Sequence, residues 1–273
     1  MNSQSKKANL FHVLHKEPGA FVIPNPWDAG SARMLAALGF KALATSSGAA
    51  AGVLGRRDGR ISREECLFQI RAIVDATDLP LAADLEKGFG DTPEIVAESI
   101  RLGAAAGLVG GSIEDATGDA AHPLFDFAHA VERIAAAAGA AATLPFKFML
   151  TARAENYLRG NPNLDDTIKR LQAFEKAGAD VLFAPGLPDL DAVRTVCASL
   201  TKPVNFMVGI RGKSFSVAEL EAAGVKRISL ATSLYRAAMT GLFDAATEIN
   251  AQGTFGYLDR AMTSAKLAEF MQP

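Results

Sequence analysis

A chain of 273 residues is long enough for one α/β barrel, which typically needs about 250, or for two smaller domains. Hydrophobic residues make up 49% of it and charged residues only 21%, which excludes extensive disorder and predicts a large core. The net charge of −2 gives no overall attraction to nucleic acid or anionic membranes, so we expect a small-molecule partner.

The N-terminal segment and the two cysteines favour a cytoplasmic protein. Residues 1–17 have no apolar run with a small-residue cleavage site, so they are not expected to be a secretory signal peptide. No stretch approaches the roughly 20 apolar residues needed to span a bilayer. Cys66 and Cys197 form no CxxC pair, and we expect both to be buried, reduced thiols.

Short apolar runs alternate with longer segments of helical periodicity along the whole chain. The expected strands are Ala20–Pro24, Lys41–Thr45, Pro80–Asp84, Gly107–Ile113, Lys147–Thr151, Asp180–Ala184, Pro203–Val208 and Arg227–Leu230. The expected helices are Ala29–Leu38, Arg63–Ala76, Pro93–Leu102, Asp126–Ala138, Asp165–Ala177, Leu190–Ser199, Val217–Ala223 and Ser233–Asn250, with an extra helix over Tyr257–Met271.

Capping residues support these helices. Ser62 followed by Glu65 forms a capping box, Pro93 suits a first helical turn, and Asp165 precedes an apolar run. Eight strand–helix repeats without a linker predict a single (β/α)8 barrel domain over residues 1–273. The alternative, an open doubly wound sheet, lacks a glycine-rich fingerprint after its first strand.

Acidic residues follow two neighbouring strands at their carboxyl ends, where barrel enzymes carry their active sites. Asp84 and Glu86 are two residues apart and are expected on the same side of the strand, and Glu114 ends the next strand. Three converging carboxylates with no nearby His or Cys favour Mg²⁺, with Mn²⁺ as the alternative. The alternative interpretation is that some of these acids cap helices or pair with arginine or lysine.

Arg153 is a cation at the end of a central strand. Its planar guanidinium suits a bidentate grip on a carboxylate or phosphonate, and the alternative is a buried ion pair with Glu155 or Glu114.

Ser46, Ser47 and Gly48 offer hydroxyl and N–H donors for an oxyanion, or else form a simple turn. Asp58, on its own, reads as part of an ordinary loop turn.

No lysine is placed for a Schiff-base mechanism, because Lys147 begins its strand and Lys87 follows two acids that it is expected to pair with. His122 is the histidine placed to reach the site, and a solvated loop histidine is the alternative.

Five motifs, in order, resemble the isocitrate lyase/phosphoenolpyruvate mutase superfamily. They are Thr45–Gly48, Gly55–Gly59, Leu79–Gly90, Gly111–Asp115 and Thr151–Arg153. The resemblance implies Mg²⁺-dependent making or breaking of a C–C or P–C bond of a keto acid or related carboxylate, through a pyruvate-enolate-like species. It further implies a homotetramer in which the eighth helix, here Ser233–Asn250, is exchanged between partners.

The resemblance implies a role for each residue of this sequence that matches a family motif. Asp58, Asp84, Glu86 and Glu114 would hold the metal, several of them through water, and Arg153 would clamp the substrate. Ser46, Ser47 and Gly48 would bind the carboxylate and the enolate oxygen. The candidate catalytic residues are Arg153, Asp58 and His122.

The chain departs from the family in the loop Asp115–Pro123, where the lyases carry a Lys-x-Cys-Gly-His type signature and the mutases a lysine. Neither a cysteine nor a lysine is present here, which argues against isocitrate or methylisocitrate cleavage and against P–C rearrangement. Asp119 or His122 are candidates for the acid role of this loop. An acid often found after the sixth strand is replaced by Pro185.

Three hypotheses follow. The leading one is a Mg²⁺-dependent lyase or hydrolase that cleaves a C–C bond of a small 2-oxo or 2-hydroxy dicarboxylate. The second is P–C bond chemistry, as a mutase or a hydrolase, on a phosphonopyruvate- or carboxyphosphonoenolpyruvate-type substrate. The third is an inactive relative that binds a keto acid.

Overall fold

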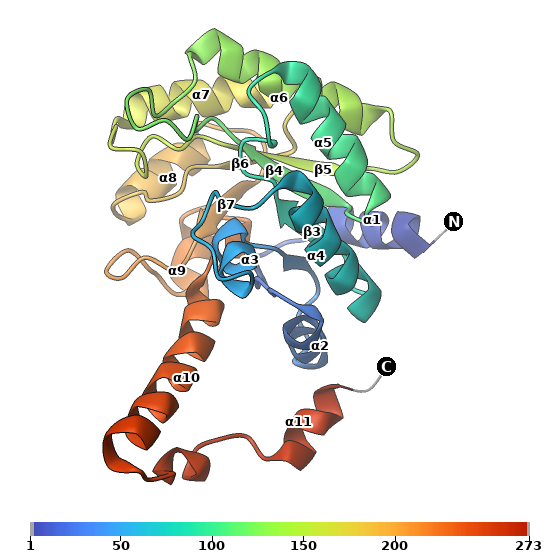
Figure 1. Cartoon of the computed structure of the whole chain (residues 1–273). Coiled ribbons are helices and arrows are strands. Elements are labelled where there is room, and N and C mark those ends of the chain that lie inside the picture. Colours follow the sequence, from blue (N-terminus) through green and yellow to red (C-terminus); the bar gives the residue numbers. More distant parts are fainter. Residues whose placement is uncertain (1–2, 272–273) are drawn as a thin grey trace.

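Eight parallel strands form a nearly closed barrel in the computed structural model, which describes residues 3–271 (Figure 1). The strands are β1 (Phe21–Ile23), β2 (Leu43–Ala44), β3 (Leu81–Asp84), β4 (Gly110–Glu114), β5 (Met149–Arg153), β6 (Val181–Phe183), β7 (Val204–Met207) and β8 (Arg227–Ser229). Their order is β1-β8-β7-β6-β5-β4-β3-β2, and at the seam the Ala44 N–H donates to the Pro24 carbonyl over 3.1 Å. The predicted (β/α)8 fold is confirmed.

Helices follow the strands around the barrel (Figure 1). They are α1 (Ser3–Leu14), α2 (Ala29–Ala37), α3 (Ser47–Val53), α4 (Arg63–Ala76), α5 (Pro93–Ala105), α6 (Phe127–Ala142), α7 (Leu164–Lys176), α8 (Leu190–Ala198), α9 (Val217–Ala222), α10 (Ser233–Gln252) and α11 (Ser264–Phe270), with a 3₁₀ turn η1 (Gly256–Asp259). Within residues 3–271 no helix is long and apolar enough to cross a membrane.

Local sequence explains where several helices begin. Ser62 and Glu65 form the predicted capping box of α4, and Pro93 occupies the first turn of α5. Asp165 is not the cap of α7, because the Asn163 side chain accepts the Asp166 N–H and starts the helix earlier. Asn and Asp are about equally good capping residues, so the sequence pattern could not show that Asn163, and not Asp165, is the cap.

Four features differ from the sequence expectation. Neither α1 nor α3 was predicted, and the tail is not one helix over 257–271 but the short η1 followed by α11. Both cysteines are free, as expected, but only Cys66 is buried, whereas Cys197 is half-buried.

Helix α1 closes the amino-terminal end of the barrel. Its residues Ala8, Phe11 and Leu14 recur on one face and pack into a buried cluster inside the strands. Gly110 makes room for this plug, since a Cβ there would lie 2.9 Å from the Phe11 ring. Within the barrel, this plug leaves the opposite end, where the strands finish, for a ligand.

His15, which follows α1, lies within this plug. Its ring is buried, its Nδ1 is 2.8 Å from the Phe11 carbonyl, and it packs edge-on against Phe11 and Phe21. Burial first, and then the nearby Arg227 charge, lower the pKa of His15 to about 3. The folded protein therefore holds His15 neutral.

This predicts acid lability. The pKa of His15 is lower in the folded protein than in the unfolded chain, so between these two values only the unfolded chain binds a proton. The contribution of His15 to the free energy of unfolding is therefore fully present above pH 6.5 and decreases as the pH falls below 6.5. Between pH 6.5 and pH 5 the wild type should lose about 2 kcal/mol more than His15→Gln. Urea unfolding at the two pH values measures this, and equal losses in both proteins would contradict it.

Candidate active site

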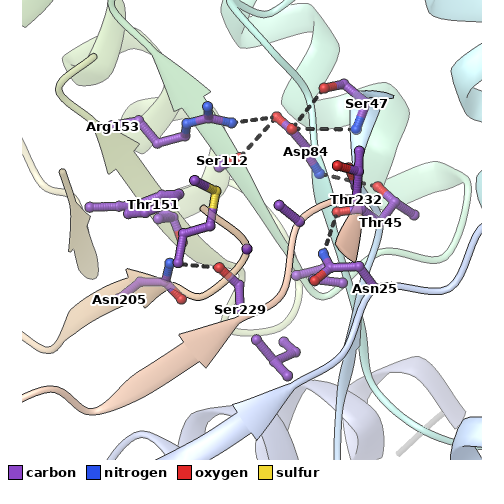
Figure 2. Close-up of a pocket in the computed structure, with 18 of the residues that line it drawn as sticks. Asn25, Thr45, Ser47, Asp84, Ser112, Thr151, Arg153, Asn205, Ser229 and Thr232 are labelled. Atoms are coloured by element: carbon purple, nitrogen blue, oxygen red, sulfur yellow. Dashed lines mark hydrogen bonds and ion pairs between the residues drawn. The ribbon is translucent and has the colours of Figure 1, made fainter. Parts of the chain in front are cut away.

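A cavity of about 430 Å³ lies within the barrel and opens where the strands end. The cavity is lined by residues that follow the strands in sequence, namely Asp58, Arg159 and Arg236. It is also lined by residues within the strands, among them Thr151 and Arg227. Figure 2 shows side chains from both sides of the barrel directed into it. The cavity has the location expected for an active site of this fold.

Arg153 gathers carboxylates on one wall of the cavity. Its guanidinium lies 2.9 Å from Asp84 Oδ1, 3.0 Å from Glu114 Oε2 and 2.7 Å from Glu155 Oε1. Arg159 contacts the other oxygens of Glu114 and Glu155 at 3.3 and 3.2 Å. The structure therefore shows the alternative predicted for Arg153, a buried ion pair. Arg153 pairs with Asp84 as well as with Glu114 and Glu155.

The ionisation of this cluster follows from burial and from its two arginines. Burial opposes ionisation of Asp84, but Arg153 and the N–H groups of Glu86 and Ser47 outweigh it and lower the pKa of Asp84. Burial raises the pKa of Glu114 to about 8, with Arg153 opposing and Glu155 adding to the shift. Burial alone would lower the pKa of Arg153, yet the surrounding acids raise it.

Glu86 lies beside this cluster but not where the strand pattern put it. The strand ends at Asp84, and Glu86 adopts a left-handed φ of 52°, so the two do not share one face of a continuing strand. Its Oε1 is buried without a hydrogen-bond partner. Burial, and then Asp84 and Asp58, raise its pKa to about 7.

These residues fit a divalent cation that keeps several waters. Within residues 3–271 no three His, Cys, Asp or Glu side chains are arranged to enclose a metal directly. Mg²⁺, however, is usually held by one or two carboxylates and water. The unpartnered Glu86 oxygen, beside Asp84 and Asp58, is an acceptor that such a cation or its water would satisfy.

The predicted oxyanion cradle starts helix α3. Ser46 is buried and lines the cavity, whereas the Ser47 N–H and hydroxyl donate to Asp84 Oδ2 at 3.4 and 3.0 Å (Figure 2). Gly48 is needed for space, because a Cβ would lie 2.9 Å from Thr232 Cγ2. Of the three residues, only Ser46 keeps its side chain free for a ligand.

The loop after β4 does not reach the cavity in this conformation. Ala116 and Leu124 bridge its two ends, and the Thr117 N–H donates to the Pro123 carbonyl over 3.1 Å. The His122 side chain is 84% exposed and lies 3.3 Å from Asp119. The structure thus places His122 away from the other predicted site residues, as a solvated loop histidine.

Of the two lysines, Lys147 lies where the sequence predicted, whereas Lys87 has a different partner from the one expected. Lys147 pairs with Asp180 ahead of the strands, at the end opposite the cavity mouth, as expected. Lys87 pairs with Asp91 at 2.6 Å and not with the two acids that precede it.

Several cavity residues were not predicted from the sequence. Thr151 and Asn205 line the cavity from within β5 and β7, and Arg227 lines it from the start of β8. Their signal is the period-2 spacing of Thr151 with Arg153 and of Arg227 with Ser229. Polar residues at inward positions of a barrel strand mark a cavity wall.

Known proteins resemble this chain over most of its length. The sequence model described as phosphoenolpyruvate phosphomutase matches residues 11–250. The 2-methylisocitrate lyase of Escherichia coli (strain K12) is 32% identical over 220 residues, covering 77% of this chain and 73% of the relative. The 2,3-dimethylmalate lyase of Eubacterium barkeri is 27% identical, covering 99% of this chain and 94% of the relative.

A solved structure from Burkholderia cenocepacia J2315, with a provisional lyase/mutase assignment, is 50% identical. It superposes with a TM-score of 0.98, covering 100% of this chain and 98% of the other.

Proposed function

Because the chain belongs to the phosphoenolpyruvate phosphomutase family of the isocitrate lyase/phosphoenolpyruvate mutase superfamily, we propose that it is a Mg²⁺-dependent carbon–carbon lyase. Its substrate class is a small 2-hydroxy or 2-oxo dicarboxylate. The observation that carries this proposal is the acidic cluster of Asp84, Glu86 and Glu114, of which Asp84 lines a cavity that also contains cationic and hydroxyl donors. Two relatives named as lyases of hydroxy acids support it.

Asp84 and Glu86 would hold the cation, with Glu114 and Asp58 acting through water. When bound, the cation would polarise the substrate oxygen on which negative charge develops. Arg153 fixes Asp84 and Glu114 in place, since each of its ion pairs is 3.0 Å or shorter. The hydroxyl groups of Ser46 and Thr232 line the cavity and can donate to that oxygen.

Asp58 is our proposed proton acceptor. It lines the cavity, and no ion pair of Asp58 occurs in the described part of the chain. When a carboxylate oxygen of Asp58 takes the substrate hydroxyl proton, a C=O bond forms and the adjacent C–C bond breaks. The electron pair of the broken bond then remains on an enolate.

The test is turnover by the purified protein. Proton NMR with MgCl₂ or with EDTA would follow keto-acid release from malate, 2-methylmalate and 2,3-dimethylmalate, and acetate or pyruvate formation from oxaloacetate above the rate without protein. We expect Mg²⁺-dependent cleavage of at least one of the four acids. No cleavage of any of them would overturn the proposal.

Asp58 and His122 should respond oppositely to substitution. Asp58→Asn removes the proton acceptor and is expected to lower kcat by about 10²–10⁴-fold. His122→Ala should leave kcat within about twofold, because the ring is 84% exposed and contacts only Asp119. The same keto-acid assay measures both, and a large loss in His122→Ala would instead show that the loop closes over the site.

A second candidate function is P–C bond chemistry, which the name of the matching family model favours. Phosphorus NMR of phosphonopyruvate incubated with the protein and MgCl₂ tests it. An unchanged spectrum would exclude this candidate.

We also propose a homotetramer in which α10 is exchanged between subunits. No residue of α10 is buried in the single chain, and the helix runs away from the barrel (Figure 1). Leu242 and Phe243 are 60% and 69% exposed, which is unusual for such large apolar side chains.

Light scattering after size exclusion should therefore give a tetramer for the wild type. The double variant Leu242→Asp/Phe243→Asp is expected to have a lower mass, because burying two carboxylates in an interface is costly. Asn250→Asp, which adds one charge at an exposed polar position of α10, is the control. A single-chain mass for the wild type would contradict the proposal.

A further inference from the structure

Arg227 is a buried cation on the cavity wall with only neutral partners. It begins β8 and is 6% exposed. Its Nε donates to Asn205 Oδ1 over 2.8 Å and its Nη2 to Thr151 Oγ1 over 2.9 Å. Its Nη1 lies 3.4 Å from Nε2 of His15, which the fold holds neutral. A guanidinium has five N–H groups, so these contacts leave two for a ligand.

The charge of Arg227 lacks a counter-ion. Among residues 3–271 no Asp or Glu forms an ion pair with it, and burial lowers its pKa to about 9. Arg153, in the same cavity, contacts three carboxylates. A buried and uncompensated charge costs several kcal/mol. A fold that retains such a charge beside open space is suited to an anion that arrives from outside.

Neutral hydrogen-bonding side chains lie next to the Arg227 guanidinium. Asn205 accepts from Arg227 through its oxygen, while its Nδ2 donates to Ser229 Oγ over 3.0 Å (Figure 2). Ser229 is two residues after Arg227 in β8, so both side chains face the cavity. Asn205 thus holds the guanidinium on one side and the hydroxyl on the other.

We propose that Arg227, Asn205 and Ser229 form an anion subsite that takes the second carboxylate of the substrate. This rests on the proposed function, in which the substrate is a small dicarboxylate. It defines the substrate class as a dianion and makes Arg227 a specificity-determining residue. A free inorganic anion such as phosphate has the same chemistry and is the other source to distinguish.

The first experiment is calorimetry with succinate and butyrate, which differ by one carboxylate, in MgCl₂ without turnover. We expect the wild type to bind succinate at least about tenfold more tightly than butyrate, as for other charge-assisted hydrogen bonds. Arg227→Gln should abolish this preference and leave the Kd of butyrate unchanged. If only inorganic phosphate binds in an Arg227-dependent way, the anion is free phosphate and the carboxylate assignment is overturned.

The second experiment does not require Arg227 to be replaced. Ser229→Asp places a fixed carboxylate beside Arg227, and Ser229→Asn is its uncharged control of similar shape. We expect the Tm of Ser229→Asp to exceed that of Ser229→Asn by about 2–4 °C or more, and succinate binding to be lost. A lower Tm for Ser229→Asp would show that Arg227 needs no counter-ion and would overturn the subsite. Both experiments measure binding or stability, so they stay informative if none of the tested acids is cleaved.

Discussion

Asp84→Asn is expected to lower kcat/KM by at least about 100-fold, because this carboxylate connects every part of the proposed site. It accepts the Ser47 hydroxyl at 3.0 Å and the Glu86 N–H at 3.1 Å, and it pairs with Arg153. An amide keeps the shape but removes the charge that would hold a cation. Steady-state kinetics and Mg²⁺ calorimetry should show the loss of turnover together with weaker metal binding.

Asp180→Asn is the matched control. Asp180 is also a partly buried acid with a cationic partner, Lys147, but it lies ahead of β6, at the opposite end of the barrel. Its substitution should leave kcat/KM within about threefold, as for residues away from the site. If Asp84→Asn were as active as Asp180→Asn, the acidic cluster would not be the catalytic centre.

Arg153→Met should have the largest effect on stability. Removing this side chain leaves Asp84, Glu114 and Glu155 buried without their main cation, which is expected to cost about 3–5 kcal/mol at neutral pH. Urea unfolding at pH 7 measures the cost. Since Glu155 is fully buried, water cannot replace the lost partner.

Arg153→Lys separates catalysis from folding. An ammonium keeps the charge but lacks the planar fork that reaches three carboxylates, so the variant should fold while kcat/KM falls by about 100-fold. Arg194→Met is the stability control, since it removes an exposed pair with Asp191 and should cost less than about 1 kcal/mol. A cost for Arg153→Met as small as for Arg194→Met would mean that its ion pairs contribute nothing.

The barrel could be predicted because each strand is a short apolar run bounded by polar or glycine residues. Helix α3 could not, since its sequence SGAAAGV has too little apolar contrast to show a helical period. Helix α1 was missed although Ala8, Phe11 and Leu14 are spaced three apart, because three positions define a periodicity poorly. Its burial depends on the barrel that it closes.

The strand-end rule located the acids and Arg153, since in a barrel all carboxyl ends meet at one face. It could not show that Arg153 would face three carboxylates, because this depends on the register between neighbouring strands. In this structure Glu114 of β4 lies opposite Arg153 of β5. Nor could it find Arg227, whose position at the start of a strand suggests the opposite rim. Only the length of the arginine side chain and the closure of the barrel bring its guanidinium to the cavity.

The most direct measurement is a crystal structure of the protein with Mn²⁺ and oxalate, an enolate mimic, with the metal located by its anomalous signal. We predict one metal peak beside Asp84, Glu86 and Asp58, with Glu86 Oε1 no longer without a partner and oxalate on the cavity side of Arg153. A cavity with no metal peak, or a metal bound elsewhere on the chain, would contradict the proposed site.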